Sequence, residues 1–188
     1  MPRALSFRPS LTIKGRKFKG LRGWAGKPFH PPLTDVPVGA YVLAPAFDVI
    51  SFLGRDEAWA RDFYRAATFT LVGGALVSVL AIVTGFWDWL RSTKKGTQAR
   101  RTVNAHAWTM VTVSVLVVVD IGLRMIAFDA DSHPPGGVLA ASLGVLLLTM
   151  VGGTIGGGLA YDYGFNVETS GDHPVWHESE TDVLPGGH

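Results

Sequence analysis

One apolar segment, residues 105–128, carries three ionisable side chains and limits what this chain can fold into. As an α-helix, at about 1.5 Å per residue, it reaches about 36 Å, enough to cross a bilayer. His106, Asp120 and Arg124 then share one helical stripe, with His106 near one membrane surface and the other two near the opposite surface. Ionisable groups in hydrocarbon are costly and usually face a bundle interior. The sequence therefore predicts partner helices that cover this stripe.

Three more apolar segments supply such partners. Hydrophobic residues make up 47% of the 188 residues and charged residues only 17%, which is typical of a membrane domain. The predicted spans are about 33–53, 66–90, 105–128 and 138–161. We expect an all-α, integral membrane four-helix bundle over residues 30–165, between an extended arm (1–29) and a tail (166–188). Residues 55–65 are expected at the interface or as an extension of the second helix.

Basic residues are distributed unevenly and predict the orientation. Of the 17 Lys and Arg residues, 13 lie in the arm or in residues 91–101. The positive-inside rule therefore places both termini in the cytoplasm. The arm is expected to contact anionic lipid, and a nucleic-acid partner is not expected because the adjacent membrane offers the same chemistry. The tail has five acidic residues and no basic ones, and we expect it to order only against a partner.

At the outer level, Asp48 arrives from the first span at the depth of Asp120 and Arg124. Asp120 and Arg124 are four residues apart with the acid first, the favourable order on a helix. One forked guanidinium could then bridge two carboxylates as a structural clamp. A proton or ion path is the alternative, because chains of intramembrane acids also serve that purpose.

At the inner level, His30 and His106 enter their helices from the same side, and Asp88 leaves the second helix there. Two imidazoles at one depth could ligate the iron of haem b or another metal, with Asp88 orienting them. A quinone or proton site, or a purely structural polar layer, would use the same residues. Because the chain has no cysteine, it cannot itself hold a Cys-ligated iron–sulfur cluster.

The fourth span is rich in glycine and carries no charge. Small residues four apart on adjacent faces predict close helix contact. A nucleotide-binding loop is rejected because no strand precedes the glycines. The residues expected to pack are Gly152, Gly153, Gly156 and Gly157.

With these residues placed, the chain resembles a bacterial four-span membrane family designated domain of unknown function 2231. The resemblance rests on residues 30–39 with Asp48, residues 85–88, His106, Arg124 and residues 157–167. Members often have a second histidine where Thr34 and Asp35 stand. This sequence is similar to the branch that resembles the membrane part of proteins with a Rieske domain, and relatives carry cytochrome c-like domains. The resemblance implies a location in a bacterial inner membrane and a redox neighbourhood, with any Rieske centre on another chain.

Two functions fit these observations best. The first is a non-catalytic subunit or anchor of a larger redox assembly, which binds protein partners through the arm and the tail. The alternative is a small b-type cytochrome or metal-binding electron carrier that uses His30 and His106. A proton path or transporter is less favoured, because four spans are few and no inverted repeat is evident. No catalytic motif indicates an enzyme.

Overall fold

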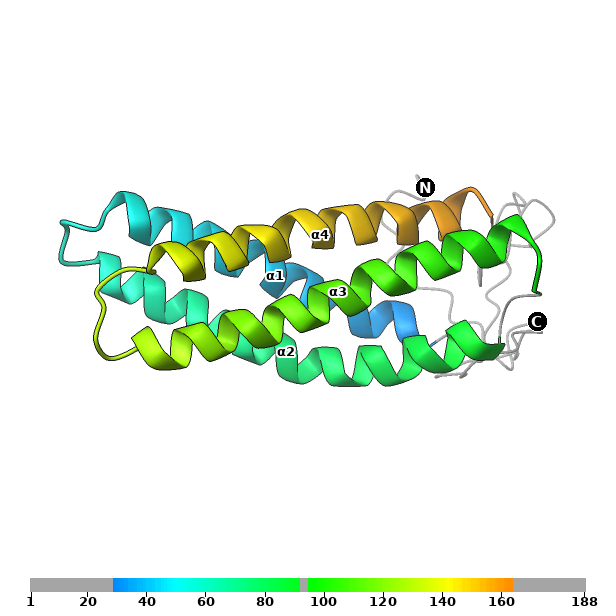
Figure 1. The fold of residues 1–188 in the computed structure, drawn as a ribbon, viewed down its shortest axis with the longest axis horizontal. Coiled ribbons are helices and arrows are strands. Elements are labelled where there is room, and N and C mark those ends of the chain that lie inside the picture. The colour runs from blue at the N-terminus through cyan, green and yellow to red at the C-terminus, as the bar shows by residue number, and fades with distance from the viewer. Residues whose placement is uncertain (1–28, 92–94, 164–188) are drawn as a thin grey trace, which may run out of the picture.

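The computed structural model describes residues 29–91 and 95–163, so the predicted arm and tail lie outside the described residues. It contains four helices in sequence: α1 (His30–Leu53), α2 (Ala60–Arg91), α3 (Gln98–Ala127) and α4 (Gly136–Tyr161). Successive helices run in opposite directions along one long axis (Figure 1). This architecture confirms the predicted all-α four-helix bundle.

Two helices begin earlier than their apolar stretches predict. α2 begins at Ala60 instead of residue 66, and α3 begins at Gln98 instead of residue 105. The start of α3 is capped, because the Thr97 hydroxyl accepts a hydrogen bond from the Arg100 backbone N–H at 3.2 Å. The added turns of α3 are mostly polar, whereas the added turn of α2 carries the buried residues Ala60 and Tyr64.

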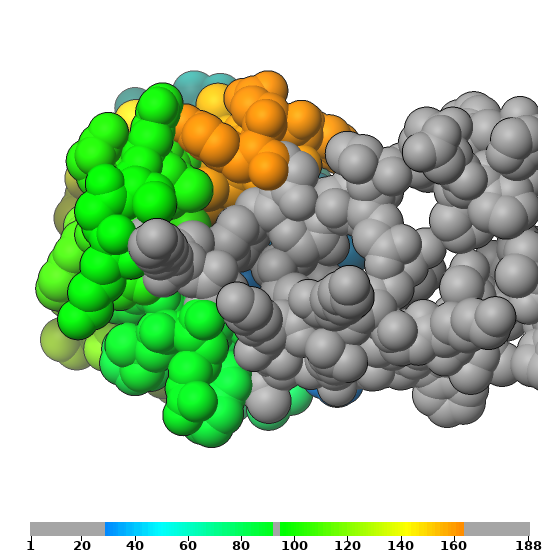
Figure 2. All heavy atoms as spheres, turned by 90° about the vertical axis from the view of Figure 1, so that its right-hand side faces the viewer, coloured from blue at the N-terminus to red at the C-terminus, as the bar shows by residue number. Residues whose placement is uncertain are grey.

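Each helix packs on two neighbours: α1 and α3 both lie against α2 and α4, so α1 and α3 are diagonal partners. The starts of α1 and α3 and the ends of α2 and α4 lie at one end, called here the histidine end because it holds His30 and His106 (Figure 1). Seen from this end, the start of α3 lies beside the end of α4 (Figure 2).

A layer of small and aliphatic side chains fills the middle of the bundle. We call it the apolar layer, and its buried members are Ala40, Tyr41, Ala44, Ala67, Leu71, Val113, Val117 and Val145. Large apolar side chains also face outward, with Leu76 70% exposed and Val118 69% exposed. All four helices are long and apolar enough to span a membrane. A lipid environment accounts for both the outward apolar surface and the apolar layer.

Candidate functional site

A cavity of about 540 Å³ opens between the four helices at the histidine end. Its volume falls within the range of cofactor sites, about 300–1,000 Å³. On α4 the lining runs from Thr149 to Ala160, which corresponds to about 16 Å along the helix. The lining is mostly apolar and includes both His30 and His106, while no Lys or Arg of the described helices contributes to it.

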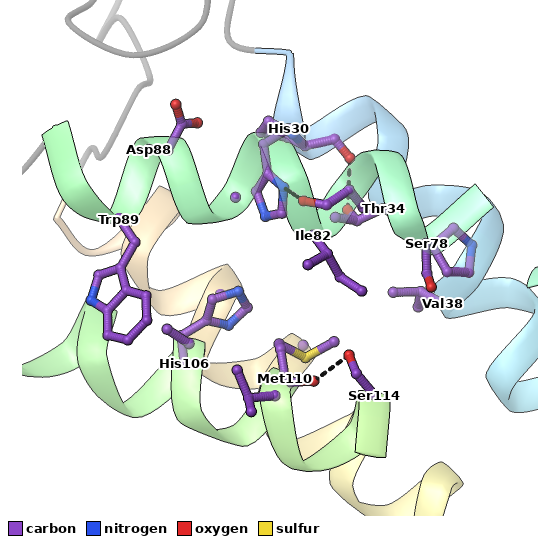
Figure 3. A pocket seen from close by; sticks show the side chains of 18 of the residues that line it. His30, Thr34, Val38, Ser78, Ile82, Asp88, Trp89, His106, Met110 and Ser114 are labelled. Atoms are coloured by element: carbon purple, nitrogen blue, oxygen red, sulfur yellow. Dashed lines mark hydrogen bonds between the residues drawn. The ribbon is translucent and has the colours of Figure 1, made fainter. Parts of the chain in front are cut away.

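Both imidazoles are oriented by backbone carbonyls. Nδ1 of His30 donates to the Ala81 carbonyl and Nδ1 of His106 donates to the Gly152 carbonyl, each at 2.9 Å. Because a carbonyl only accepts, Nδ1 carries a proton in both rings, and in the neutral form of each ring Nε2 therefore keeps its lone pair. Figure 3 shows the two rings pointing from opposite walls into the same space. Two neutral imidazoles thus present ligating nitrogens to one cavity.

A glycine makes room for each ring. A Cβ added at Gly85 would lie 2.5 Å from Cε1 of His30, and one added at Gly156 would lie 3.0 Å from Cε1 of His106. In both helices this glycine follows the hydrogen-bonded carbonyl by four residues. The same helical turn therefore anchors an imidazole and leaves space beside it. This arrangement occurs once between α1 and α2, and once between α3 and α4.

The four glycines expected to pack on α4 fall on two faces. Gly152 and Gly156 meet α3, where a Cβ at Gly152 would lie 2.5 Å from Sδ of Met110. Gly153 and Gly157 line the cavity, and a Cβ at Gly153 would meet nothing within 4 Å. The second pair therefore leaves a flat wall without side chains.

Other lining residues mark the rim and the deep part of the cavity. Asp88 lines the rim, its carboxylate pointing away from the imidazoles (Figure 3). The carbonyls of Ala81 and Gly152, not Asp88, hold the two Nδ1 atoms. Thr149 is 1% exposed, and its hydroxyl has no hydrogen-bond partner among the described residues. A buried hydroxyl without a hydrogen-bond partner costs about 1–3 kcal/mol.

Gly85 and Thr149 are site residues that the sequence alone does not reveal. The contact between Gly85 and the His30 ring depends on how far α1 and α2 are shifted along each other, and the sequence does not give that shift. Thr149 is one of three Ser or Thr residues in the apolar sequence of α4, with Ser142 and Thr154, so nothing in the sequence distinguishes it.

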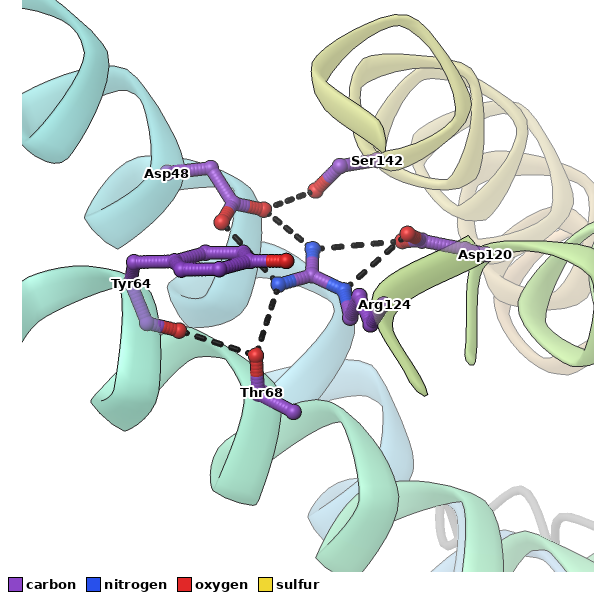
Figure 4. A network of polar contacts seen from close by, with 6 residues as sticks. All are labelled: Asp48, Tyr64, Thr68, Asp120, Arg124 and Ser142. Carbon is purple, nitrogen blue, oxygen red and sulfur yellow. Dashed lines mark hydrogen bonds and ion pairs between the residues drawn. The ribbon is translucent and has the colours of Figure 1, made fainter. Parts of the chain in front are cut away.

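A second polar site lies at the other end of the bundle (Figure 4). All five N–H donors of Arg124 form hydrogen bonds. Its Nε donates to Asp120 at 3.0 Å, and its terminal nitrogens reach both oxygens of Asp48, the far oxygen of Asp120 and the Thr68 hydroxyl. Asp48, Asp120 and Arg124 are each fully buried. The guanidinium therefore joins α1, α2 and α3 at one point.

Hydroxyl and aromatic groups complete this ion cluster, which comprises Asp48, Tyr64, Thr68, Asp120, Arg124 and Ser142. The Ser142 hydroxyl donates to Asp48 at 2.6 Å, which adds α4. The Tyr64 ring lies 5.8 Å from the guanidinium carbon. Every helix thus contributes to the cluster, and this geometry suits a structural clamp.

Equal spacing relates the two sites. His30 precedes Asp48 by 18 residues, and His106 precedes Arg124 by the same number. Eighteen residues make five helical turns, so each pair shares one helix face about 27 Å apart. The hydrocarbon core is about 30 Å thick. The histidines and the ion cluster therefore lie near opposite membrane surfaces, with the apolar layer between them.

The fold and its two buried polar levels define a four-span helical membrane protein. A family described as "Predicted membrane protein (DUF2231)" matches residues 26–169, which is most of the chain. The chain belongs to this family. No curated protein matches the chain, and no solved structure does.

Proposed function

We propose that this chain is a small b-type cytochrome, an electron carrier that holds haem b between His30 and His106. The observation that carries the proposal is the paired imidazole geometry. Each Nδ1 is tied to a carbonyl, and each Nε2 is left for a ligand in one shared cavity. Histidine ligands of metals usually donate their other ring N–H in this way.

The residues present fit a haem. His30 and His106 lie on the diagonal helices α1 and α3 and would hold the haem from two walls of the cavity, while α2 and α4 form the other two walls. Those two helices offer Gly85, Gly153 and Gly157 at the cavity wall. A bare metal ion fits less well, because the described residues contain no group of three or more His, Cys, Asp or Glu that could hold one.

The protein groups would set the properties of the bound haem. Haem b supplies a one-electron iron couple when bound. The two carbonyl-bonded imidazoles would ligate the iron and stay in one tautomer. The apolar lining would exclude water and support a planar macrocycle.

The proposed electron carrier would also be a subunit of a larger redox assembly. A carrier with one haem site requires an electron donor and an acceptor, which other chains must provide. The resemblance to the Rieske-fused branch supports such neighbours, and the basic arm and acidic tail are the segments proposed to bind them. By the positive-inside rule, the histidine end would face the cytoplasm.

A reduced-minus-oxidised absorption spectrum of the purified full chain tests the haem. We expect a Soret band, sharp α and β bands, and one haem per chain by pyridine haemochrome assay. His30→Ala and His106→Ala should each remove or strongly broaden these bands. His133→Ala is the matched control, because His133 lies at the opposite end of the bundle beside Phe52 and should leave the spectrum intact.

Far-UV circular dichroism and size-exclusion profiles of each variant report folding separately from haem content. A flat spectrum of folded wild-type protein after addition of haemin would overturn the proposal. Bands that survive in both folded alanine variants would also overturn it, because iron would then be held elsewhere.

A further inference from the structure

We propose that the deep half of the cavity binds the ring of a lipid-soluble quinone, which enters from the bilayer between α2 and α3. This inference goes beyond the haem proposal and does not depend on it. The deep half is formed by Tyr41, Ser78, Ser114 and Thr149, one from each helix. In Figure 3, Ser78 and Ser114 lie farther from Asp88 at the rim than either histidine does.

Thr149 provides the polar contact. Its side chain is almost fully buried, it lines the cavity, and its hydroxyl has no hydrogen-bond partner among the described residues. A ring carbonyl in the deep half would accept a hydrogen bond from this hydroxyl. Thr154, one face away on the same helix, differs because its hydroxyl donates to the Met150 carbonyl at 2.9 Å.

The cavity opens sideways at membrane depth. α2 and α3 diverge toward the histidine end (Figure 1), and the cavity residues on their facing edges are exposed, with Ile82 at 48% and Val115 at 60%. Near the membrane surface, a hydrogen bond from the Trp89 indole to the Asn104 side chain, at 2.7 Å, joins α2 to α3 and closes this opening. A ligand would therefore enter from the lipid side, below this hydrogen bond.

A second hollow supplies a path for an apolar tail. It measures about 300 Å³ on the surface of α3 and is lined by Ser114, Val115, Val118 and Val119. Ser114 and Val115 also line the cavity, so the two spaces adjoin. A compact ring in the cavity could thus continue into a long hydrocarbon chain along α3.

The lack of cationic side chains in the lining favours a ligand with a neutral head group. No Lys or Arg from the described helices lines the cavity, so the charged group of a fatty acid or an anionic lipid buried in its deep half would have no such cation to pair with. Burying an unpaired charge is strongly unfavourable. A quinone has two ring carbonyls, no charge and an isoprenoid tail, and it matches the hydroxyl, the apolar walls and the adjoining hollow.

Titration of the purified full chain with decylubiquinone, followed by tryptophan fluorescence, tests this site, because Trp89 lines the cavity. We expect saturable quenching. Thr149→Val keeps the shape but removes the hydroxyl, and it should raise the dissociation constant about fivefold. Val115→Phe should weaken binding by narrowing the opening. The matched controls Thr154→Val and Leu147→Phe, both on the lipid-facing side of α4, should bind as wild type does.

The same titration on His106→Ala separates this inference from the haem. Quinone binding that persists there, with the haem bands lost, supports a distinct quinone site. Absence of saturable quenching in wild type, or equal affinities of Thr149→Val and Thr154→Val, overturns it. Oleate that binds more tightly than decylubiquinone would also overturn it, because the site would then prefer an anion.

Discussion

Replacing Arg124 with alanine should be among the most destabilising single changes in this bundle. The substitution removes five hydrogen bonds and leaves two buried carboxylates without their cation. Breaking a buried ion pair by removing one partner costs about 3–5 kcal/mol. The two acids are not affected equally, because Asp48 keeps the Ser142 hydroxyl, whereas both contacts of Asp120 in the cluster are to Arg124.

This asymmetry predicts the order of rescue. In the Arg124→Ala background, Asp120→Asn should recover more of the lost stability than Asp48→Asn does, because it neutralises the acid left with fewer partners. The free energy of unfolding can be measured by titrating SDS into mixed micelles and following far-UV circular dichroism. Arg55→Ala is the control: Arg55 is exposed beside Phe52, and its loss should cost less than about 1 kcal/mol.

Two outcomes would refute the reasoning. A loss for Arg124→Ala no larger than that for Arg55→Ala would show that the cluster contributes little to stability. Strictly additive losses in the Arg124→Ala/Asp120→Asn double variant would show that the two side chains are not coupled.

The remaining predictions concern the glycine-rich helix and the orientation. Gly156→Leu should lower thermal stability more than Gly153→Leu, because a side chain at 156 meets the His106 ring while one at 153 enters open space; equal melting temperatures would contradict this. Gly153→Leu should instead reduce the haem content of the proposed site, as read from the haemochrome assay. Ser132→Cys, in a chain without native cysteine, should react with an impermeant maleimide from outside the cell; labelling only after membrane disruption would reverse the proposed orientation.

The helices could be predicted closely because their signal is local. Length and hydropathy identify four spans, and the end of α1 at Leu53 and the end of α4 at Tyr161 agree with the prediction. The start of α3 was not predicted, because residues 98–104 are mostly polar and the Thr97 cap alone is a weak sequence signal. The longer α2 corresponds to one of the two alternatives expected for residues 55–65, an extension of the second helix, and Ala60 and Tyr64 continue its buried face.

The sites were less predictable because they depend on register between helices. Three charges in apolar surroundings were enough to place Asp48, Asp120 and Arg124 at one depth. The hydroxyls of Thr68 and Ser142 could not be predicted as members of the cluster, because single hydroxyls recur throughout these spans. Likewise, topology put the two histidines at one end, but the carbonyls that hold them depend on a specific shift of α1 along α2 and of α3 along α4.

For the proposed haem, the apolar layer determines where in the membrane field an electron would be held. It fills the bundle between the histidine end and the ion cluster with aliphatic and small side chains. An electron held between His30 and His106 would therefore enter and leave near one membrane surface. Moving one elementary charge across the whole membrane is worth about 2.3 kcal/mol per 100 mV, and such an electron would cross only a small part of that field. Its exchange would therefore couple only weakly to the membrane potential, and the redox midpoint of the site would change little as the cell's voltage changes.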